Sequence, residues 1–165
     1  MNTWSHYLLF PFSVLYRFII LFRNFCYDKK LIKTNQLPCN VISIGNISFG
    51  GTGKTPTVLY LCRMLQENKK NDIAILSRGY KRNTSGTVLV SSGNGPLKNW
   101  QAVGDEPFMM AQKTKNIPIV VDSNRYRGGK FLIKNFNSKV IILDDGFQHR
   151  SLSRNLDIVL INGGT

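Results

Sequence analysis

Acidic side chains are scarce in this sequence, which has nine Asp and Glu residues against 22 Lys and Arg and a formal net charge of +13. The excess of positive charge favours an anionic partner, and nucleic acid, an anionic membrane and a phosphorylated substrate all fit it. Four of the nine acids form two adjacent pairs, Asp105 with Glu106 and Asp144 with Asp145. Acids that are scarce yet paired point to a cation site.

Cysteines are also few, and the three in the chain lie far apart, in neither a C-x-x-C pair nor a metal-ligand cluster. Such spacing fits a reducing compartment, with the thiols as packing residues. There is no internal repeat and no low-complexity segment. At 165 residues the chain has room for one ordinary core, so one domain is the default expectation.

The N-terminal segment lacks the basic start and the small-residue cleavage site of a secretory signal, so we expect it to stay on the protein. Residues 7–25 read YLLFPFSVLYRFIILFRNF and are followed by three lysines. The apolar residues favour insertion by roughly 0.3 to 0.6 kcal/mol each, whereas a central Arg17 opposes it by about 2.5 to 3.5 kcal/mol. A membrane-spanning helix and a helix lying in the interface therefore both stay open, beside an amphipathic helix packed on the soluble part.

A membrane-associated helix over residues 1–35, followed by an α/β domain over residues 36–165, is the domain organisation that we predict. If the helix is a membrane anchor, the lysines that directly follow it suit the anionic cytoplasmic leaflet, and the rest of the chain is then expected in the cytoplasm.

The rest of the chain alternates short apolar runs with helical patterns. Runs expected to be strands cover residues 41–44, 73–76, 87–90, 117–121, 140–143 and 156–161, and helical stretches begin at Lys54, Asp105 and Arg125. Several runs are apolar at every position, as is typical of strands covered on both faces. The pattern predicts an α/β fold with a doubly wound, mostly parallel sheet. Residues 83–96 break the alternation and are expected to form a hairpin excursion.

A glycine-rich loop, ISFGGTGKTP at residues 47–56, connects the first strand to the first helix. In a phosphate loop, backbone N–H groups surround the phosphates, a lysine reaches the terminal phosphates and a hydroxyl binds magnesium. Ser48 stands where the usual pattern has its first glycine, but two extra glycines inside the loop can adopt positive φ angles instead. The sequence therefore predicts a P-loop NTPase-like site for a nucleotide, made of Ser48, Phe49, Gly50, Gly51, Thr52, Gly53, Lys54 and Thr55; the family resemblance given below implies that the nucleotide is ATP.

The acidic pair Asp144 and Asp145 directly follows an apolar strand, at the sheet edge where open α/β folds bind their ligands. This resembles a Walker B arrangement, in which Mg²⁺ is shared with Thr55 and the nucleotide phosphates. The other pair, Asp105 and Glu106, begins a helix, where carboxylates also act as simple caps.

Arginines follow two other strands, in the segments SRGYKR (77–82) and DSNRYRGG (122–129). A planar guanidinium binds phosphate oxygens in pairs, so Arg78, Arg82, Arg125 and Arg127 are candidates for holding a phosphorylated substrate. A core position is the simplest interpretation of His149.

Taken in order, the motifs GNISFGGTGKTP, SRGY, GDEP, DSNRYRGG and DDGFQHRSLSRNLDIVLI resemble the tetraacyldisaccharide 4'-kinase family. The resemblance implies ATP-dependent phosphorylation of the 4'-hydroxyl of an acylated glucosamine disaccharide 1-phosphate, in lipid A biosynthesis at the cytoplasmic face of the bacterial inner membrane. It also implies the roles of single residues. Asp105 would be the catalytic carboxylate; Thr55, Glu106, Asp144 and Asp145 would serve the metal; Arg78, Tyr80 and Arg125 would contact substrate or phosphate.

The chain departs from the family pattern in three places. Asn155 and Asn162 stand where acids are usual, and both are expected to be peripheral. Members of the family also continue beyond the position of Thr165, so we expect the chain to correspond to an N-terminal half that binds nucleotide weakly and transfers phosphate poorly or not at all. A monomer without nucleic-acid partners is expected.

Two other functions compete with the kinase. One is a membrane-tethered P-loop NTPase that acts as a switch, although the chain has no N-K-x-D base-recognition motif. The other is a basic nucleic-acid-binding protein, which would interleave aromatic and basic residues on one surface. The aromatic residues here concentrate in the N-terminal segment, which favours the kinase.

Overall fold

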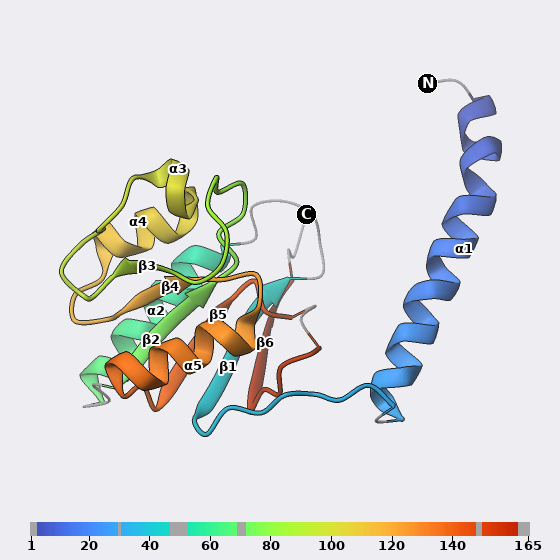
Figure 1. Ribbon diagram of the computed structural model, residues 1–165. Helices are drawn as coiled ribbons and strands as arrows, with labels where there is room; N and C mark the ends of the chain where they lie inside the picture. The colour runs from blue at the N-terminus through green and yellow to red at the C-terminus, as the bar shows by residue number, and fades with distance from the viewer. Residues whose placement is uncertain (1–2, 30, 47–52, 69–71, 148–149, 162–165) are drawn as a thin grey trace. The chain divides into compact units, whose positions relative to one another are not determined.

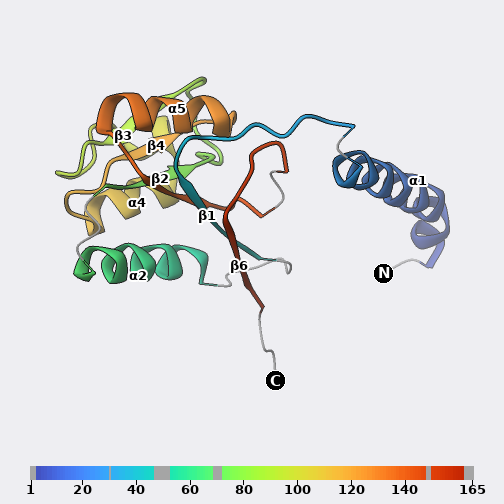
Figure 2. The same cartoon turned by 90° about the horizontal axis from the view of Figure 1, so that it is seen from below.

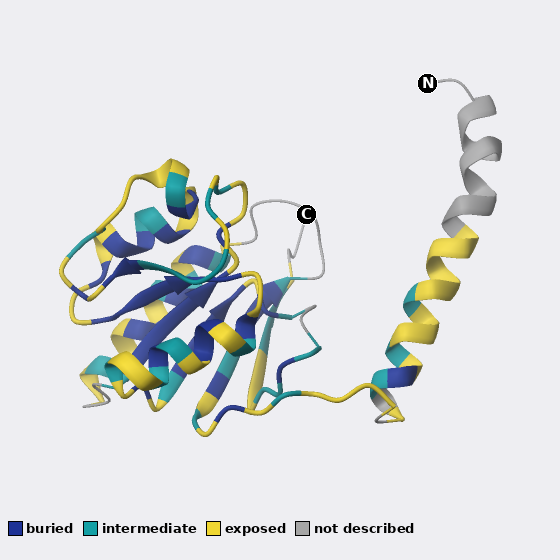
Figure 3. Cartoon of the chain, viewed as in Figure 1, coloured by how far each residue is buried: buried dark blue, intermediate teal, exposed yellow. Residues whose placement is uncertain are grey.

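The protein is described by a computed structural model over residues 3–29, 31–46, 53–68, 72–147 and 150–161. The chain divides into two compact units, Met1–Thr34 and Asn35–Thr165. The first unit contains one long helix, α1 (Thr3–Asp28). Large apolar side chains along α1 are exposed (Figure 3), namely Val14, Leu15, Tyr16, Phe18, Ile19, Leu21, Phe22 and Phe25. None of the helices in the described part of the chain has both the length and the apolar character that crossing a bilayer requires.

The second unit is built on a six-stranded sheet with the strand order β3-β4-β2-β5-β1-β6 (Figure 1). All neighbouring strands are parallel except β3, which runs antiparallel to β4 at one edge. This confirms the predicted α/β class and the mostly parallel sheet. The strands are β1 (Asn40–Asn46), β2 (Ile73–Ser77), β3 (Val88–Ser91), β4 (Ile119–Val121), β5 (Val140–Asp144) and β6 (Leu156–Leu160).

Helices cover both faces of the sheet, as the apolar strands require. Figure 2 shows α2 (Lys54–Glu67) and α4 (Asp105–Lys113) on one face and α5 (Arg125–Phe136) on the other. Alternate residues of each inner strand face the two resulting cores: in β2, for example, Ile75 packs with the α2 and α4 side chains, whereas Leu76 packs with the α5 side chains. Because both faces are covered, these strands read as continuous apolar runs instead of an alternating pattern.

Helix α5 forms although it contains two adjacent glycines, which are poor helix formers. A Cβ atom at Gly128 would lie 2.7 Å from Leu76 Cδ1, and one at Gly129 would collide with Leu37 Cδ1. The glycines therefore let the first turns of α5 approach the sheet closely, and this contact outweighs their low helix propensity.

The excursion over residues 83–96 differs from the expected hairpin. It contributes β3, but the chain then passes through α3 (Trp100–Val103) and α4 before it returns as β4, the partner of β3. The pairing is therefore not a local hairpin, and two helices separate the paired strands along the chain.

Asn155, expected to be peripheral, has a structural role: its side chain accepts a hydrogen bond from the backbone N–H of Val41 at 2.8 Å and so holds the start of β1.

Candidate nucleotide and phosphate site

The candidate site lies at one edge of the sheet because four parallel strands end there. β1 leads into the glycine-rich loop, β2 into Arg78, β4 into Asp122 and β5 into Asp144. The register places Asp144 beside Ile44 of β1, the strand that precedes the loop. This is the edge where open α/β sheets bind their ligands.

Within the predicted phosphate loop, the described residues begin at Gly53. Gly53 has a left-handed conformation (φ 76°) and precedes the first turn of α2, where its carbonyl accepts the Thr57 hydroxyl at 2.9 Å. Thr55 is buried in that turn. A helix N-terminus preceded by a left-handed glycine is suited to hold phosphate with backbone N–H groups. The other predicted loop residues, Ser48, Phe49, Gly50, Gly51 and Thr52, lie outside the described residues, as do His149 and Asn162.

Lys54 forms an ion pair with Asp145, with 2.9 Å between Nζ and Oδ1. Partial burial opposes the lysine charge, but the hydrogen bond and the charge of Asp145 outweigh it and raise the pKa of Lys54. The charges of Glu106 and Asp144 act in the same direction. The structure thus brings the lysine of the loop together with members of both predicted acidic pairs.

Asp144 is almost fully buried at the end of β5. Its Oδ2 accepts a hydrogen bond from the Ser77 hydroxyl at 2.9 Å, whereas Oδ1 is buried with no hydrogen-bond partner among the described residues. Burial raises the pKa of Asp144 to about 6 against the opposing hydrogen bond from Ser77, and the charges of Glu106 and Asp145 raise it further. A buried carboxylate oxygen without a partner is a costly arrangement that a bound cation would relieve.

Asp145 follows in a left-handed conformation, with φ of 55°. This backbone turn separates the two carboxylates: Asp144 is buried, whereas the side chain of Asp145 is exposed and reaches Lys54. Non-glycine residues in this conformation carry strain of roughly 1 kcal/mol or more, and such strain is concentrated at functional sites.

Arg125, at the start of α5, is the cation buried most deeply at this edge, with 2% of its surface exposed. Its Nη1 donates to the carbonyl of Asp122 at 2.6 Å, and its Nε is buried with no partner in the part of the chain that the structure describes. Burial lowers its pKa to about 10, which the negative charge of Asp144 opposes and the positive charge of Arg78 reinforces. Arg125 therefore stays charged at neutral pH, close to the carboxylates and with an N–H group available for an anion.

The loop after β2 meets the start of α4. A Cβ atom at Gly104, which precedes the helix, would lie 2.9 Å from the Tyr80 carbonyl oxygen. The structure thus brings the SRGY and GDEP segments into contact. Asp105 and Glu106 occupy the first turn of α4 and are exposed, and the Glu106 charge reaches both Lys54 and Asp144.

Sequence reasoning missed the buried carboxylate that organises the start of α5. Asp122 has no exposed surface. Its two carboxylate oxygens accept hydrogen bonds from Nε and Nη2 of Arg127, each at 2.8 Å. The Thr87 hydroxyl and the backbone N–H of Asn124 donate to the same carboxylate. Burial opposes the charge, but these hydrogen bonds hold the pKa of Asp122 below its ordinary value.

Two arginines proposed for phosphate binding are therefore engaged with the protein itself. Arg127 is committed to Asp122, and Arg82 donates to the carbonyls of Val121 at 3.2 Å and Gly86 at 2.7 Å. Their position directly after strands looked the same in the sequence as that of Arg78 and Arg125. The hydrogen-bond partners of Arg82 and Arg127 belong to neighbouring segments of the sheet edge, so the residues next to each arginine in the sequence do not reveal them.

Comparison with known proteins identifies the family. The sequence profile described as tetraacyldisaccharide-1-P 4'-kinase (LpxK) matches residues 5–165. The chain belongs to this family. Among curated family members, the tetraacyldisaccharide 4'-kinase of Aquifex aeolicus is 46% identical over 153 residues, and that of Chlorobium limicola is 45% identical over 158 residues. The resemblance inferred from the ordered motifs is thereby confirmed.

A solved structure of a family member has the same fold. The crystal structure of LpxK from Aquifex aeolicus, described as a complex with ATP, superimposes with a TM-score of 0.87 at 46% identity. The match covers 95% of this chain and 49% of that structure. The matched region covers 48% of the Aquifex aeolicus kinase and 45% of the Chlorobium limicola kinase. The chain therefore spans about half the length of the curated relatives it matches.

Proposed function

We propose that this chain supplies the nucleotide-binding half of a kinase that transfers the terminal phosphate of ATP to the 4'-hydroxyl of a tetraacylated glucosamine disaccharide 1-phosphate. Family membership supports the reaction class. The observation that carries the proposal is the convergence of Lys54, Asp144 and Arg125 at the edge where β1 enters the glycine-rich loop. Family membership also favours this function over a P-loop switch or a nucleic-acid-binding protein.

Lys54 binds the terminal phosphates of ATP in this proposal. In the structure its ammonium is held by Asp145, and the ion pair keeps the flexible side chain close to the sheet edge. An arriving triphosphate competes with Asp145 for Lys54. The N–H groups at the start of α2 and the unpartnered Nε–H of Arg125 supply further donors for phosphate oxygens.

Mg²⁺ fits the donor set of this edge. Among the described residues no group of three or more His, Cys, Asp and Glu side chains could hold a metal ion by itself. Mg²⁺ in phosphate-transfer sites is held by one or two carboxylates together with substrate phosphates, so a smaller protein set suffices. Asp144, with its unpartnered Oδ1, and the Thr55 hydroxyl would hold the ion, with Asp145 and Glu106 nearby. When bound there, such an ion would neutralise charge on the phosphate that is transferred.

Asp105 is the residue that we propose as the catalytic carboxylate. It lies at the first position of α4, exposed, next to Glu106, whose charge reaches Lys54 and Asp144. A carboxylate at this place would accept the proton of the attacking 4'-hydroxyl as the bond to phosphorus forms. Arg78 and Tyr80, both exposed on the loop that touches the start of α4, would contact the acceptor.

Helix α1 is proposed to hold the protein at the cytoplasmic face of the inner membrane, where the acylated acceptor resides. Exposed Phe18 and Phe22 are apolar side chains that a water-facing helix does not favour, and Lys29 and Lys33 follow them. A helix with apolar side chains and flanking cations binds the interface of an anionic bilayer.

The proposal is tested by measuring ATP binding to the full chain by calorimetry with Mg²⁺. The Lys54→Ala variant should weaken ATP binding at least about tenfold, since a charge-assisted hydrogen bond contributes about 1.5 to 3 kcal/mol. Lys98→Ala, which removes an exposed lysine elsewhere, is the matched control and should leave the affinity unchanged. Equal loss in both variants would show that general charge, and not the loop, holds the nucleotide.

Phosphate transfer is tested with labelled ATP and the acylated disaccharide 1-phosphate in detergent micelles. Any transfer by the chain should disappear in Asp105→Ala, while ATP binding by this variant persists. Transfer that survives Asp105→Ala would assign the proton-accepting role to another group.

A further inference from the structure

The orientation of Arg125 at the nucleotide edge depends on the turn that precedes it. This turn lies between β4 and α5, and within it the Asp122 carbonyl accepts Nη1 of Arg125 at 2.6 Å. The bond directs the guanidinium, while its Nε–H has no partner among the described residues. Because Arg125 is the first residue of α5, its side chain is placed only as well as the turn is held.

The Asp122 side chain holds this turn. One carboxylate oxygen accepts the backbone N–H of Asn124 at 2.9 Å, and both oxygens accept hydrogen bonds from the Arg127 guanidinium. The Asn124 side chain caps α5 by accepting the backbone N–H of Arg127 at 3.0 Å. The carboxylate and the carbonyl belong to the same residue, so a displaced Asp122 carboxylate would also displace the carbonyl that orients Arg125.

A further contact with the carboxylate comes from a distant part of the chain. Thr87, directly before β3, donates its hydroxyl to Asp122. The two residues face each other because Val88 of β3 pairs with Val121 of β4 in antiparallel register, and Thr87 and Asp122 are the next residues outward. The end of the loop between β2 and β3 is thus bonded to the turn that carries Arg125.

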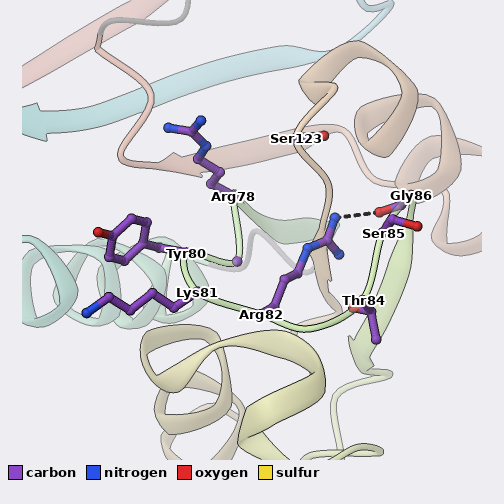
Figure 4. A pocket seen from close by; sticks show the side chains of 9 residues that line it. Arg78, Tyr80, Lys81, Arg82, Thr84, Ser85, Gly86 and Ser123 are labelled. Carbon is purple, nitrogen blue, oxygen red and sulfur yellow. Dashed lines mark hydrogen bonds between the residues drawn. The ribbon is translucent and has the colours of Figure 1, made fainter.

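Arg82 fixes the end of this loop. Its guanidinium donates to the carbonyls of Gly86 at 2.7 Å and Val121 at 3.2 Å, which ties the residue before Thr87 to the end of β4. Figure 4 shows the bond to Gly86 and, across the same pocket, Ser123, which follows Asp122 in the turn. A continuous set of hydrogen bonds therefore connects the loop, through Thr87 and Asp122, to Arg125.

We infer that Asp122 and Thr87 are positioning residues for nucleotide binding, which act through Arg125 and do not contact the nucleotide. The inference rests on the proposed function, in which the Nε–H of Arg125 donates to a phosphate oxygen. A guanidinium binds phosphate more strongly when its donors already point toward the site, because less freedom is lost on binding. The bond from Thr87 to Asp122 supplies this preorganisation by fixing the carboxylate and with it the carbonyl that orients Arg125.

The test measures binding of a non-hydrolysable ATP analogue with Mg²⁺ to the full chain, by amide chemical shifts in NMR titrations. Thr87→Val keeps the shape of the side chain but removes the hydroxyl, and it should raise the Kd about fivefold, the effect of one neutral hydrogen bond. Thr87→Ser keeps the hydroxyl and should bind the analogue within about twofold of the parent Kd. Thr114→Val is the matched control: it removes a hydroxyl that donates to the Met110 carbonyl at the far end of α4, and it should leave the Kd unchanged.

A double-mutant cycle separates positioning from a general loss of structure. Arg125→Gln alone should raise the Kd at least about tenfold, because it removes a charged donor. If Thr87 acts through Arg125, Thr87→Val should cause no further increase of the Kd in a protein that already carries Arg125→Gln. A general destabilisation would instead weaken binding equally in both backgrounds.

The Nε–H signal of Arg125 gives a second measurement, which needs no nucleotide. The spectrum of Arg125→Gln lacks this side-chain signal and so assigns it. In the chain without nucleotide, the signal should shift or broaden in Thr87→Val, where the guanidinium loses its fixed orientation, and should stay unchanged in Thr114→Val.

Each of four results would overturn the inference: an unchanged Kd in Thr87→Val, equal loss of affinity in both backgrounds of the cycle, equal loss in Thr114→Val, or an undisturbed Arg125 signal in Thr87→Val. Failure of the proposed function gives a different result, namely that the parent chain does not bind the analogue or that Arg125→Gln binds it as well as the parent does. In that case the Nε–H signal still decides whether Thr87 and Asp122 position Arg125.

Discussion

Replacing Asp144 with asparagine should stabilise the protein near neutral pH, although Asp144 is proposed to hold the metal ion. The carboxylate is almost fully buried, and burial raises its pKa from 3.8 to about 6. Asparagine has the same shape and does not ionise, and its side-chain oxygen can still accept the Ser77 hydroxyl. The substitution therefore removes a buried charge without opening a cavity.

The size and the pH dependence of the effect follow from the raised pKa. A difference of about 2 pKa units corresponds to roughly 3 kcal/mol. Because the folded state holds the proton more tightly, Asp144 causes no penalty below pH 3.8, where the carboxyl is protonated in both states. The penalty grows as the pH rises toward 6 and is complete above it. The advantage of Asp144→Asn should be up to about 3 kcal/mol at pH 7.5 and only about 1 kcal/mol at pH 4.5.

Urea unfolding of both proteins at pH 7.5 and pH 4.5, without nucleotide or divalent cations, measures this difference. Asp72→Asn is the matched control, because its partly exposed carboxylate pairs with exposed Lys139. This change should alter the free energy of unfolding by less than about 1 kcal/mol at either pH. A destabilised Asp144→Asn protein, or a difference that does not change with pH, would refute the argument that Asp144 is buried at the expense of stability. Addition of ATP and Mg²⁺ should stabilise the parent protein more than the variant.

Three further predictions concern other parts of the chain. Gly128→Ala should destabilise the protein by about 1 to 3 kcal/mol in urea unfolding despite the better helix propensity of alanine, because the new methyl group meets Leu76; an unchanged or higher stability would contradict the close approach of α5. Thr87→Val should cost about 1 to 3 kcal/mol in the same assay, because it removes a hydrogen bond to buried Asp122; a neutral effect would contradict that contact. Replacing Phe18 and Phe22 with serine should reduce flotation with phosphatidylglycerol vesicles at least about tenfold without changing ATP affinity, since each loses roughly 2 kcal/mol of apolar burial; unchanged flotation would place the membrane contact elsewhere.

Much of the fold was predictable because its signals are local. Each of the six apolar runs is a strand, since a strand covered on both faces needs apolar residues at successive positions. The start of α2 at Lys54 followed from the glycine-rich loop, and α4 begins at Asp105 as expected. The partner of β3 could not be predicted, because strand pairing depends on where the intervening helices place the chain and not on the strand itself.

The candidate site was predictable in part for a related reason. Parallel strands end at a common edge, so Lys54, Asp144 and the arginines that follow strands were expected near one another. The sequence does not distinguish an arginine that awaits a ligand from one that is already paired. Arg125 has a buried Nε–H without a partner, whereas Arg127, two residues later, is fully engaged by Asp122. That difference depends on Thr87 and the turn at Asn124, which are distant from each other in the chain.

The groups at this edge that are unfavourable for folding are those that a bound nucleotide and metal ion would satisfy. Among the described residues, Asp144 carries a buried oxygen without a partner and Arg125 carries a buried N–H without a partner. Asp122 at the same edge is by contrast buried with its carboxylate paired to neighbours, whereas the buried Ser43 hydroxyl of β1 also lacks a partner among the described residues. Since an unsatisfied buried group costs about 1 to 3 kcal/mol, a carboxylate oxygen and a guanidinium N–H that are both unpaired at one edge are best explained by a ligand that carries both charges. A triphosphate with its cation has this character, with negative oxygens for Arg125 and a positive ion for Asp144.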